Sequence, residues 1–391
     1  MIKLIKSTFY NERETKKALC EFIKNSAQLS IGSECKKFEH TFAKWQKRKY
    51  CIMVNSGSSA NLAIVQALLN LGKLSKGDYV GFSAVTWSTN VMPLIQLGLK
   101  PVPIDVELNT LNVSSKNLTE KLNKYPIKMF FLTNLLGFCD DIDEIKKVCD
   151  KKKIILIEDN CESLGTIYKG RKLGNFGLAS TFSFYVGHHF STIEGGAVCT
   201  DNEELETMLQ MVRAHGWDRN LTEKKQLKIR LKHNVNSTFY SRYTFYDLGY
   251  NLRTTEINGL IGNIQIKYID EIVEKRKNNF FKMAVPIYKK TNKYYPVKYN
   301  HIDLLSNFAV PVICKTPQIK QELVEKCKEK VEIRPIVGGD MALQPFFKKY
   351  VDNFTGENLN AKIIHEQGLY FGNNPELTEE EMSTIVKIFT S

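Results

Sequence analysis

The chain has 391 residues and a mass of 44.9 kDa, a length typical of two or three domains. Hydrophobic residues make up 43% of it and charged residues 25%, which excludes disordered and collagen-like proteins. The net charge of +13 is most simply explained by a solvated, lysine-rich surface. An anionic small-molecule substrate is the next interpretation. Nucleic acid comes third and is not expected, because no nucleic-acid-binding motif accompanies the scattered lysines.

The sequence predicts a cytoplasmic protein without a membrane segment. The apolar run Val91–Leu99 stops at Lys100, well short of the ~20 residues that a membrane helix needs. The N-terminus lacks the apolar core and cleavage site of a signal peptide. The nine cysteines show no CxC or CxxC spacing, so we expect free thiols and no metal cluster.

From about residue 49, short β-rich runs alternate with longer helical patterns. The predicted strands are Tyr50–Val54, Tyr79–Phe82, Pro101–Ile104, Met129–Thr133 and Ile154–Ile157. The predicted helices between them are Ser58–Leu71, Ser88–Leu97 and Ile142–Asp150. This alternation indicates an α/β fold with a mostly parallel central sheet that is covered on both faces.

The pattern changes in the second half of the chain. We predict two neighbouring strands at Thr181–Tyr185 and Gly196–Cys199, followed by a helix at Glu203–Arg213. A lysine-rich loop is predicted over residues 221–245, and a long helical stretch over Thr254–Lys290. The remainder mixes helices and strands. We therefore predict a large α/β domain over residues 1–250 and a smaller C-terminal α+β domain over residues 251–391.

Three segments combine residue types that are useful for chemistry. Asn55–Asn61 follows a strand and opens a helix with small residues, as a phosphate cradle does, although an ordinary helix N-cap has the same composition. Glu158–Glu162 ends an apolar strand, where open α/β sheets bind ligands. A carboxylate there can pair with a pyridinium N–H or simply cap the next turn. His188 and His189 follow a third strand.

Together these segments resemble the sugar aminotransferases of the DegT/DnrJ/EryC1/StrS family of pyridoxal-phosphate enzymes. Five motifs occur in the family's order, at Asn55–Asn61, Thr86–Thr89, Glu158–Ser163, Ser183–Gly196 and Gly249–Glu256. The resemblance implies the aspartate aminotransferase-like fold, fold-type I. It also implies that the large domain binds pyridoxal 5′-phosphate or pyridoxamine 5′-phosphate, and that a homodimer shares its active sites.

The resemblance also assigns roles to single residues. Trp87 would stack on the pyridine ring, Asp159 would pair with the ring nitrogen, and Glu162 would face the ring hydroxyl. The resemblance implies that the phosphate is bound by Gly57, Ser58 and Ser183. It also implies that Asn251 reaches the phosphate from the neighbouring subunit.

One departure from the family pattern decides the implied reaction. His188 stands where the family's cofactor-binding lysine belongs, and no lysine lies between Lys172 and Lys224. Without that amine the cofactor cannot be held covalently. A histidine at this position is the hallmark of the family's 3-dehydratases, which remove the C3 hydroxyl of a nucleotide-linked 4-keto-6-deoxy sugar. We therefore expect His188 to be the catalytic base, with His189 as a structural neighbour.

The same branch implies the remaining partners. L-Glutamate would regenerate pyridoxamine phosphate, its carboxylates held by Arg219 and Arg253, although both arginines also suit ordinary surface ion pairs. GDP is the expected nucleotide, with the Glu332 carboxylate accepting two guanine N–H groups. Glu332 equally suits a solvated strand residue. The sequence does not distinguish a hexose from a 6-deoxyheptose.

Three other functions fit less well. An iron–sulfur 3-dehydrase fed by a reductase would need clustered cysteines, so no reductase partner is expected. An ordinary nucleotide-sugar aminotransferase would need the missing lysine. A non-catalytic sugar-nucleotide-binding protein would have no reason to keep Asp159, Trp87 and the phosphate loop.

Overall fold

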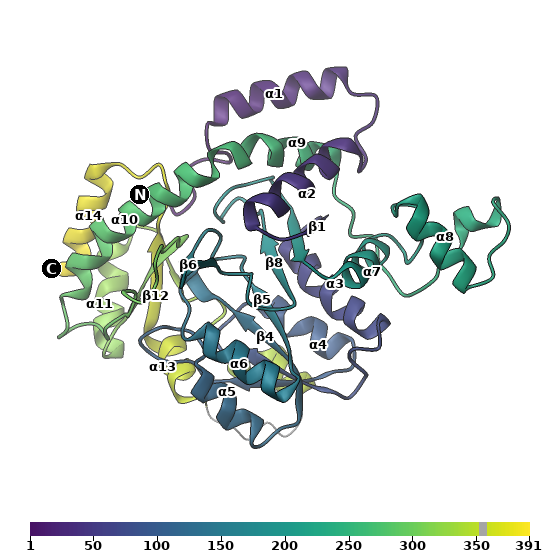
Figure 1. Ribbon diagram of the computed structural model, residues 1–391. Coiled ribbons are helices and arrows are strands. Elements are labelled where there is room, and N and C mark those ends of the chain that lie inside the picture. Colours follow the sequence, from purple (N-terminus) through teal and green to yellow (C-terminus); the bar gives the residue numbers. More distant parts are fainter. Residues whose placement is uncertain (352–357) are drawn as a thin grey trace.

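The computed structural model describes residues 1–351 and 358–391. A seven-stranded sheet forms its centre, in the order β1-β9-β8-β5-β4-β2-β3 (Figure 1). β9 runs antiparallel to both of its neighbours, and the other neighbouring pairs are parallel. The strands span β1 Tyr50–Val54, β2 Tyr79–Ser83, β3 Lys100–Ile104, β4 Ile127–Thr133, β5 Ile155–Asp159, β8 Ala179–Ser183 and β9 Gly196–Thr200. The predicted mostly parallel α/β sheet is therefore confirmed.

Helices cover both faces of this sheet because its strands are apolar on both sides. Along β1, Ile52 and Val54 pack into the core beneath α3 and α7, whereas Cys51 and Met53 join the core beneath α2. This is the alternation that a strand imposes on successive side chains. The helices of this part are α1 Glu12–Asn25, α2 Ser33–Gln46, α3 Gly57–Asn70, α4 Met92–Gln96, α5 Ser115–Leu122, α6 Ile142–Lys152, α7 Glu203–Arg213, α8 Glu223–Lys232, α9 Glu256–Gln265 and α10 Ile269–Tyr288.

A smaller antiparallel sheet, in the order β10-β12-β11, organises the C-terminal part. Its elements are β10 Ala309–Ile313, α11 Pro317–Cys327, β11 Ile333–Pro335, α12 Pro345–Tyr350, α13 Leu359–Gln367, β12 Gly368–Gly372 and α14 Glu379–Thr390. α10 packs along α14. The N-terminus also belongs here in space, because Ile2 bridges to Val331 and Leu4 lies in the core shared with β10 and β12. A short hairpin, β6 Ile167–Tyr168 and β7 Arg171–Lys172, precedes β8.

Two expectations about single elements need correction. Residues 221–245, predicted as a loop, contain α8 and a 3-10 turn at Tyr240–Tyr243. α8 buries none of its side chains, so it lacks the apolar stripe by which a helix is identified in a sequence. The predicted helix at Ser88–Leu97 is a 3-10 turn followed by the short α4. Pro93 explains the break, since it lacks an N–H and restricts the residue before it.

Within the described residues, no helix is both long enough and apolar enough to span a membrane. The α8 segment stands away from the body of the molecule, at the end opposite the C-terminal helices (Figure 1). The division at residue 250 remains a prediction.

Candidate active site

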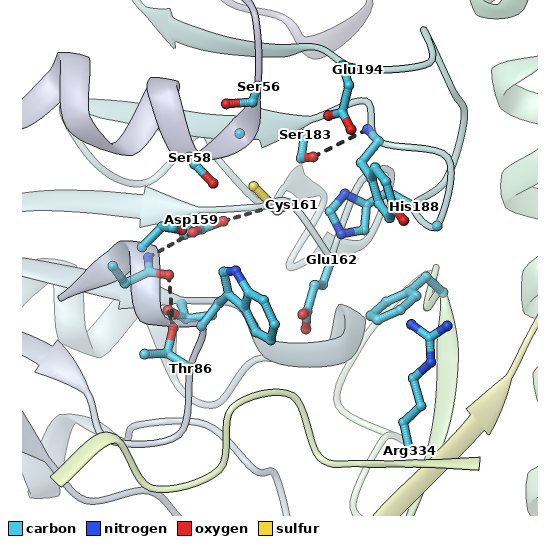
Figure 2. A pocket seen from close by; sticks show the side chains of 18 of the residues that line it. Ser56, Ser58, Thr86, Asp159, Cys161, Glu162, Ser183, His188, Glu194 and Arg334 are labelled. Carbon is cyan, nitrogen blue, oxygen red and sulfur yellow. Dashed lines mark hydrogen bonds between the residues drawn. The ribbon is translucent and has the colours of Figure 1, made fainter. Parts of the chain in front are cut away.

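A cavity of about 300 Å³ opens at the carboxyl ends of β5 and β8. This is the edge at which parallel α/β sheets usually bind ligands. The C-terminal part closes the opposite side with Phe308, Arg334 and Tyr370. Figure 2 shows side chains from these distant parts of the sequence around one space.

The N-terminus of α3 forms one wall of the cavity. The Ser56 hydroxyl caps the helix by accepting a hydrogen bond from the Ser59 amide at 3.0 Å. Gly57 is required by a close approach, because a Cβ there would lie 2.6 Å from the Cβ of Ser183. First-turn N–H groups lack helical partners and carry the positive end of the helix dipole. Gly57, Ser58 and Ser183 thus line a pocket suited to a phosphate.

Asp159 faces the cavity from the end of β5 and is 5% exposed. Its carboxylate accepts hydrogen bonds from the side chain of Asn90 at 2.7 Å, the side chain of Asn61 at 3.0 Å and the Cys161 amide at 2.9 Å. These three N–H donors fix the carboxylate in one orientation. A cationic N–H in the cavity is the complementary partner for it.

Glu158, the preceding residue, shows what a structural carboxylate looks like in the same strand. Its side chain points to the other face of the sheet, where it is fully buried. It accepts backbone N–H groups from Gly174, Phe176 and Gly177, each at 2.7 Å. It therefore holds the turn before β8 and has no part in the cavity.

His188 lies in the loop between β8 and β9 and lines the cavity with its half-buried ring. The ring meets Phe308 and Tyr185 edge-on, with centroids 5.7 and 6.0 Å apart. Burial lowers the pKa of His188 to about 4, with Asp159 opposing that shift and Arg276 adding to it. The imidazole is therefore neutral at pH 7 and can accept a proton.

His189 points away from the cavity. It is 3% exposed, and its Nε2 lies 3.1 Å from the carbonyl oxygen of Ser306. Among the described residues that line the cavity, none is a lysine. His188 therefore lines the cavity at the sequence position where the resemblance to the family leads one to expect a lysine.

Trp87 and Glu162 complete the cavity wall. Trp87 is 55% exposed, so its indole offers a face on which a flat ring can stack. The Glu162 carboxylate accepts the Leu136 amide at 2.9 Å. Burial raises the pKa of Glu162 to about 8, so at pH 7 this side chain can donate a hydrogen bond to an oxygen.

Glu332 lies outside the cavity lining, unlike its neighbour Arg334. One carboxylate oxygen of Glu332 accepts the Leu4 amide at 2.9 Å, and the other accepts Arg334 at 2.7 Å. Glu332 therefore orients the guanidinium that reaches the cavity rim. Its contact with guanine remains a prediction.

Asn251, Arg219 and Arg253 also lie outside the cavity lining, and they gather around Trp217. The Arg219 guanidinium lies 4.2 Å from the ring centroids of both Trp217 and Tyr243. Arg253 lies 5.7 Å from Trp217 and donates to the Asn251 side-chain oxygen at 2.9 Å. These three predicted residues thus form one group, separate from the cavity of their own chain.

Several residues with clear roles in this geometry had no role assigned from the sequence. Asn61 and Asn90 hold Asp159, and Arg334 reaches the cavity from β11. Asn61 ends the first of the five motifs that resemble the family, and that motif could have pointed to it. Asn90 follows its motif in a turn, and only the fold brings it to Asp159.

The geometry suits a flat, phosphorylated, nitrogen-containing ring. An anion site at the start of α3, a carboxylate at the end of β5 and an indole face border one cavity. Pyridoxal phosphate has a phosphate for the anion site, a ring nitrogen for the carboxylate and a flat ring for the indole face. The residues present therefore fit this cofactor.

The comparisons with known proteins agree with this geometry. The model of the DegT/DnrJ/EryC1/StrS aminotransferase family matches residues 10–390. The GDP-4-keto-6-deoxy-D-mannose 3-dehydratase of Yersinia pseudotuberculosis is 35% identical over 376 residues, which cover 93% of this chain and 92% of that protein.

Two solved structures of GDP-4-keto-6-deoxymannose-3-dehydratase are each 32% identical to this chain, with a TM-score of 0.89 over the whole of both chains. One is a histidine-to-asparagine mutant with bound GDP-perosamine. The other contains a trapped geminal diamine of pyridoxal phosphate and glutamate. The predicted fold-type I architecture is therefore confirmed.

Proposed function

The chain belongs to the DegT/DnrJ/EryC1/StrS aminotransferase family, and we propose that it is a lysine-free 3-dehydratase. It removes the C3 hydroxyl of a nucleotide-linked 4-keto-6-deoxy sugar and uses pyridoxal and pyridoxamine phosphate as cofactor. The observation that carries this proposal is His188 in the cavity beside Asp159, with no lysine among the described lining residues.

The residues divide the work between holding the cofactor and moving a proton. Pyridoxamine phosphate, when bound, supplies an amine that condenses with the C4 ketone and a ring that withdraws electrons. Gly57, Ser58 and Ser183 would hold its phosphate, and Asp159 would pair with the ring nitrogen. Trp87 would cover the ring face.

His188 acts at the reacting carbon. With the cofactor bound, its neutral imidazole would accept a proton from the C4′ carbon. That proton and the hydroxide from C3 together make up the water that dehydration removes. Glu162, which holds a proton at pH 7, donates a hydrogen bond to the ring oxygen. None of the described side chains on the cavity wall offers the amine that a transaminase uses to release its product.

A GDP-linked sugar and L-glutamate are the proposed substrates. A similar enzyme has been solved with bound GDP-perosamine, and another structure holds a pyridoxal-phosphate–glutamate adduct. In this chain Arg334 supplies a cation at the cavity rim, and Glu332, which holds it, is the candidate for guanine. Glutamate restores the amine of the cofactor, and the sugar reaction releases ammonia.

We further propose that two copies of the chain share their active sites. The segment that carries Arg219 ends at Asn251 and Arg253, and it exposes several large side chains. These are Phe239, Tyr240, Tyr243, Phe245 and Leu248, each more than half exposed. Large exposed apolar side chains that occur together in one segment are typical of a protein interface. A twofold dimer would bring Asn251 and Arg253 to the partner's cavity.

The product of the reaction tests the activity directly. The protein would be incubated with L-glutamate, pyridoxal phosphate and a GDP-linked 4-keto-6-deoxyhexose, and the nucleotide sugar analysed by mass spectrometry. Loss of oxygen at C3 together with release of ammonia is the expected result. Gain of an amine on the sugar would instead establish an aminotransferase, and a parallel reaction with the CDP-linked sugar tests the preference for GDP.

A further inference from the structure

Arg276, in the middle of α10, is a buried cation with no carboxylate partner among the described residues. It is 4% exposed. Its guanidinium donates to three backbone carbonyls, those of Asn373 at 2.6 Å, His188 at 3.0 Å and Phe308 at 3.3 Å. A buried arginine is normally paired with an acidic group, because charge is costly to remove from water. Burying the Arg276 charge without an acidic partner therefore costs folding free energy. Packing alone does not explain why an arginine stands at this position.

The three carbonyls come from parts of the chain that meet behind His188. The Phe308 ring packs edge-on against the His188 ring, with centroids 5.7 Å apart. Asn373 returns a hydrogen bond to the Arg276 carbonyl at 2.8 Å and donates to that of Asn307 at 3.0 Å. Arg276 thus joins the loop after β8 to the start of β10 and the end of β12.

We propose that Arg276 is a positioning residue for His188, which fixes the backbone of its loop and places a fixed positive charge behind its ring. This inference rests on the proposed function, in which His188 is the base. The second effect matters because an imidazole that already carries a proton cannot accept another. A like charge nearby disfavours that protonated form.

The other charges around the ring come from several elements. The titratable groups that share its cavity are Asp159, Cys161, Glu162, Glu194, Tyr185, Tyr370 and Arg334. His189 lies beside it in the loop, and the Arg276 charge lowers the pKa of both histidines. Asp159 acts in the opposite direction on His188. Arg276 therefore offsets the carboxylate that the cofactor ring requires.

Two substitutions separate the charge from the contacts. Arg276→Gln removes the charge, and Arg276→Lys keeps it but cannot span three carbonyls. Arg213→Lys is the matched control, because Arg213 is also a buried arginine but pairs with Glu39 on the far side of β1. The imidazole signal of His188, assigned by its loss in His188→Asn, would be titrated by NMR in each holoenzyme, and kcat and KM measured against pH.

We expect Arg276→Gln to raise the titration midpoint of His188 by roughly one unit, and to move the acid limb of kcat in the same direction. Arg276→Lys should leave the midpoint in place and lower kcat about tenfold, with KM little changed. Arg213→Lys should lower the melting temperature without moving the midpoint.

Two results would overturn the inference. One is an Arg276→Gln protein that melts earlier but titrates as the wild type does. The other, which decides the matter if Arg276→Gln does not fold, is an Arg276→Lys protein with wild-type kcat. Failure of the proposed function would be seen separately, as a wild-type protein without dehydratase activity whose His188 midpoint still responds to position 276.

Discussion

The cavity wall at the ends of β5 and β8 differs sharply from the segment 215–253 that carries the other predicted site residues. On the cavity wall, Asp159 is held by the side chains of Asn61 and Asn90, and the Glu162 carboxylate accepts the backbone amide of Leu136. In the 215–253 segment, Arg219 and Arg253 lie against aromatic rings, and Tyr243 is 71% exposed.

The difference indicates which part of the site one chain can build alone. The Asp159 carboxylate and the capped start of α3 are held by contacts within one chain. Exposed aromatic side chains and arginines without an acidic partner in contact are typical of a surface that another molecule covers. The cofactor-binding half of the site thus belongs to one chain, and the other half is proposed to be completed by a second copy.

The largest effect on activity is expected from His188→Asn. This substitution tests the cofactor-binding half of the site, which one chain forms alone. Loss of a general base typically costs 10²–10⁴-fold, so dehydration should fall by about 10³-fold or more. Cofactor should still bind, because the contacts at α3 and Asp159 remain. Steady-state turnover and the absorbance of bound cofactor measure the two separately, and His189→Asn is the control that should keep most of the activity.

His188→Lys is the reverse experiment on the same residue. An amine at this position should hold pyridoxal phosphate covalently, which borohydride reduction followed by mass spectrometry would detect. The wild-type protein should release its cofactor on dialysis and show no such adduct. A reduced adduct on any lysine of the wild type would refute the lysine-free mechanism.

The second largest effect on activity is expected at Asn251, in the half of the site that we propose is shared between two chains. Asn251→Ala should lower activity about 10- to 100-fold, because the contact it makes across the dimer is lost. Mixing it with inactive His188→Asn protein, after unfolding and refolding together, should restore about a quarter of wild-type activity, since half of the dimers are mixed and each then holds one intact site. A mixture that is no more active than the refolded Asn251→Ala protein alone would mean that each chain works alone.

The same comparison explains how much of the molecule was predictable. The strands of the large sheet were found from their apolar runs, and α7 was predicted at Glu203–Arg213, where it lies. Gly57, Ser58, Asp159 and Ser183 reach one cavity because each ends a strand or begins a helix, and the ends of parallel strands meet at one edge. His188 joins them from the loop that follows β8. Local sequence therefore determined their place.

The contacts that the sequence did not reveal depend on long-range packing. Asn90 reaches Asp159 from a turn 69 residues earlier, and Arg276 reaches the His188 carbonyl from 88 residues later. α8 remained hidden because it buries no side chain. In each case the information lies in the pairing of distant segments, which spacing within one segment does not carry.

A third, smaller effect concerns stability against pH. Burial lowers the pKa of His188 to about 4 in the folded protein, while the unfolded chain titrates near 6.5. Below that value the unfolded state binds more protons, so stability should fall as pH drops from about 6.5 to 4, by roughly 2 kcal/mol. Urea unfolding at several pH values should show that His188→Asn loses less stability over this range than the wild type does. Equal slopes would mean that His188 is not held neutral.

The smallest effect is expected from Glu162→Gln, and its sign is opposite to that of His188. Burial raises the pKa of Glu162 to about 8 from an ordinary value near 4.5. Between these two pH values the folded protein keeps a proton on Glu162 that the unfolded chain loses. The contribution of Glu162 to the free energy of unfolding is therefore present at low pH and is lost as pH rises from about 4.5 to 8. Glutamine resembles the protonated carboxyl, so the variant should resist alkaline pH better than the wild type.

The same substitution has a matching consequence for activity. If the protonated Glu162 donates to the cofactor's ring oxygen, the glutamine amide can replace it, and activity at pH 7 should fall by only about two- to threefold. Above pH 8 the wild type should lose activity as Glu162 ionises, and the variant should not. A variant whose alkaline limb coincides with that of the wild type would assign that limb to another group and leave Glu162 a structural partner of the Leu136 amide.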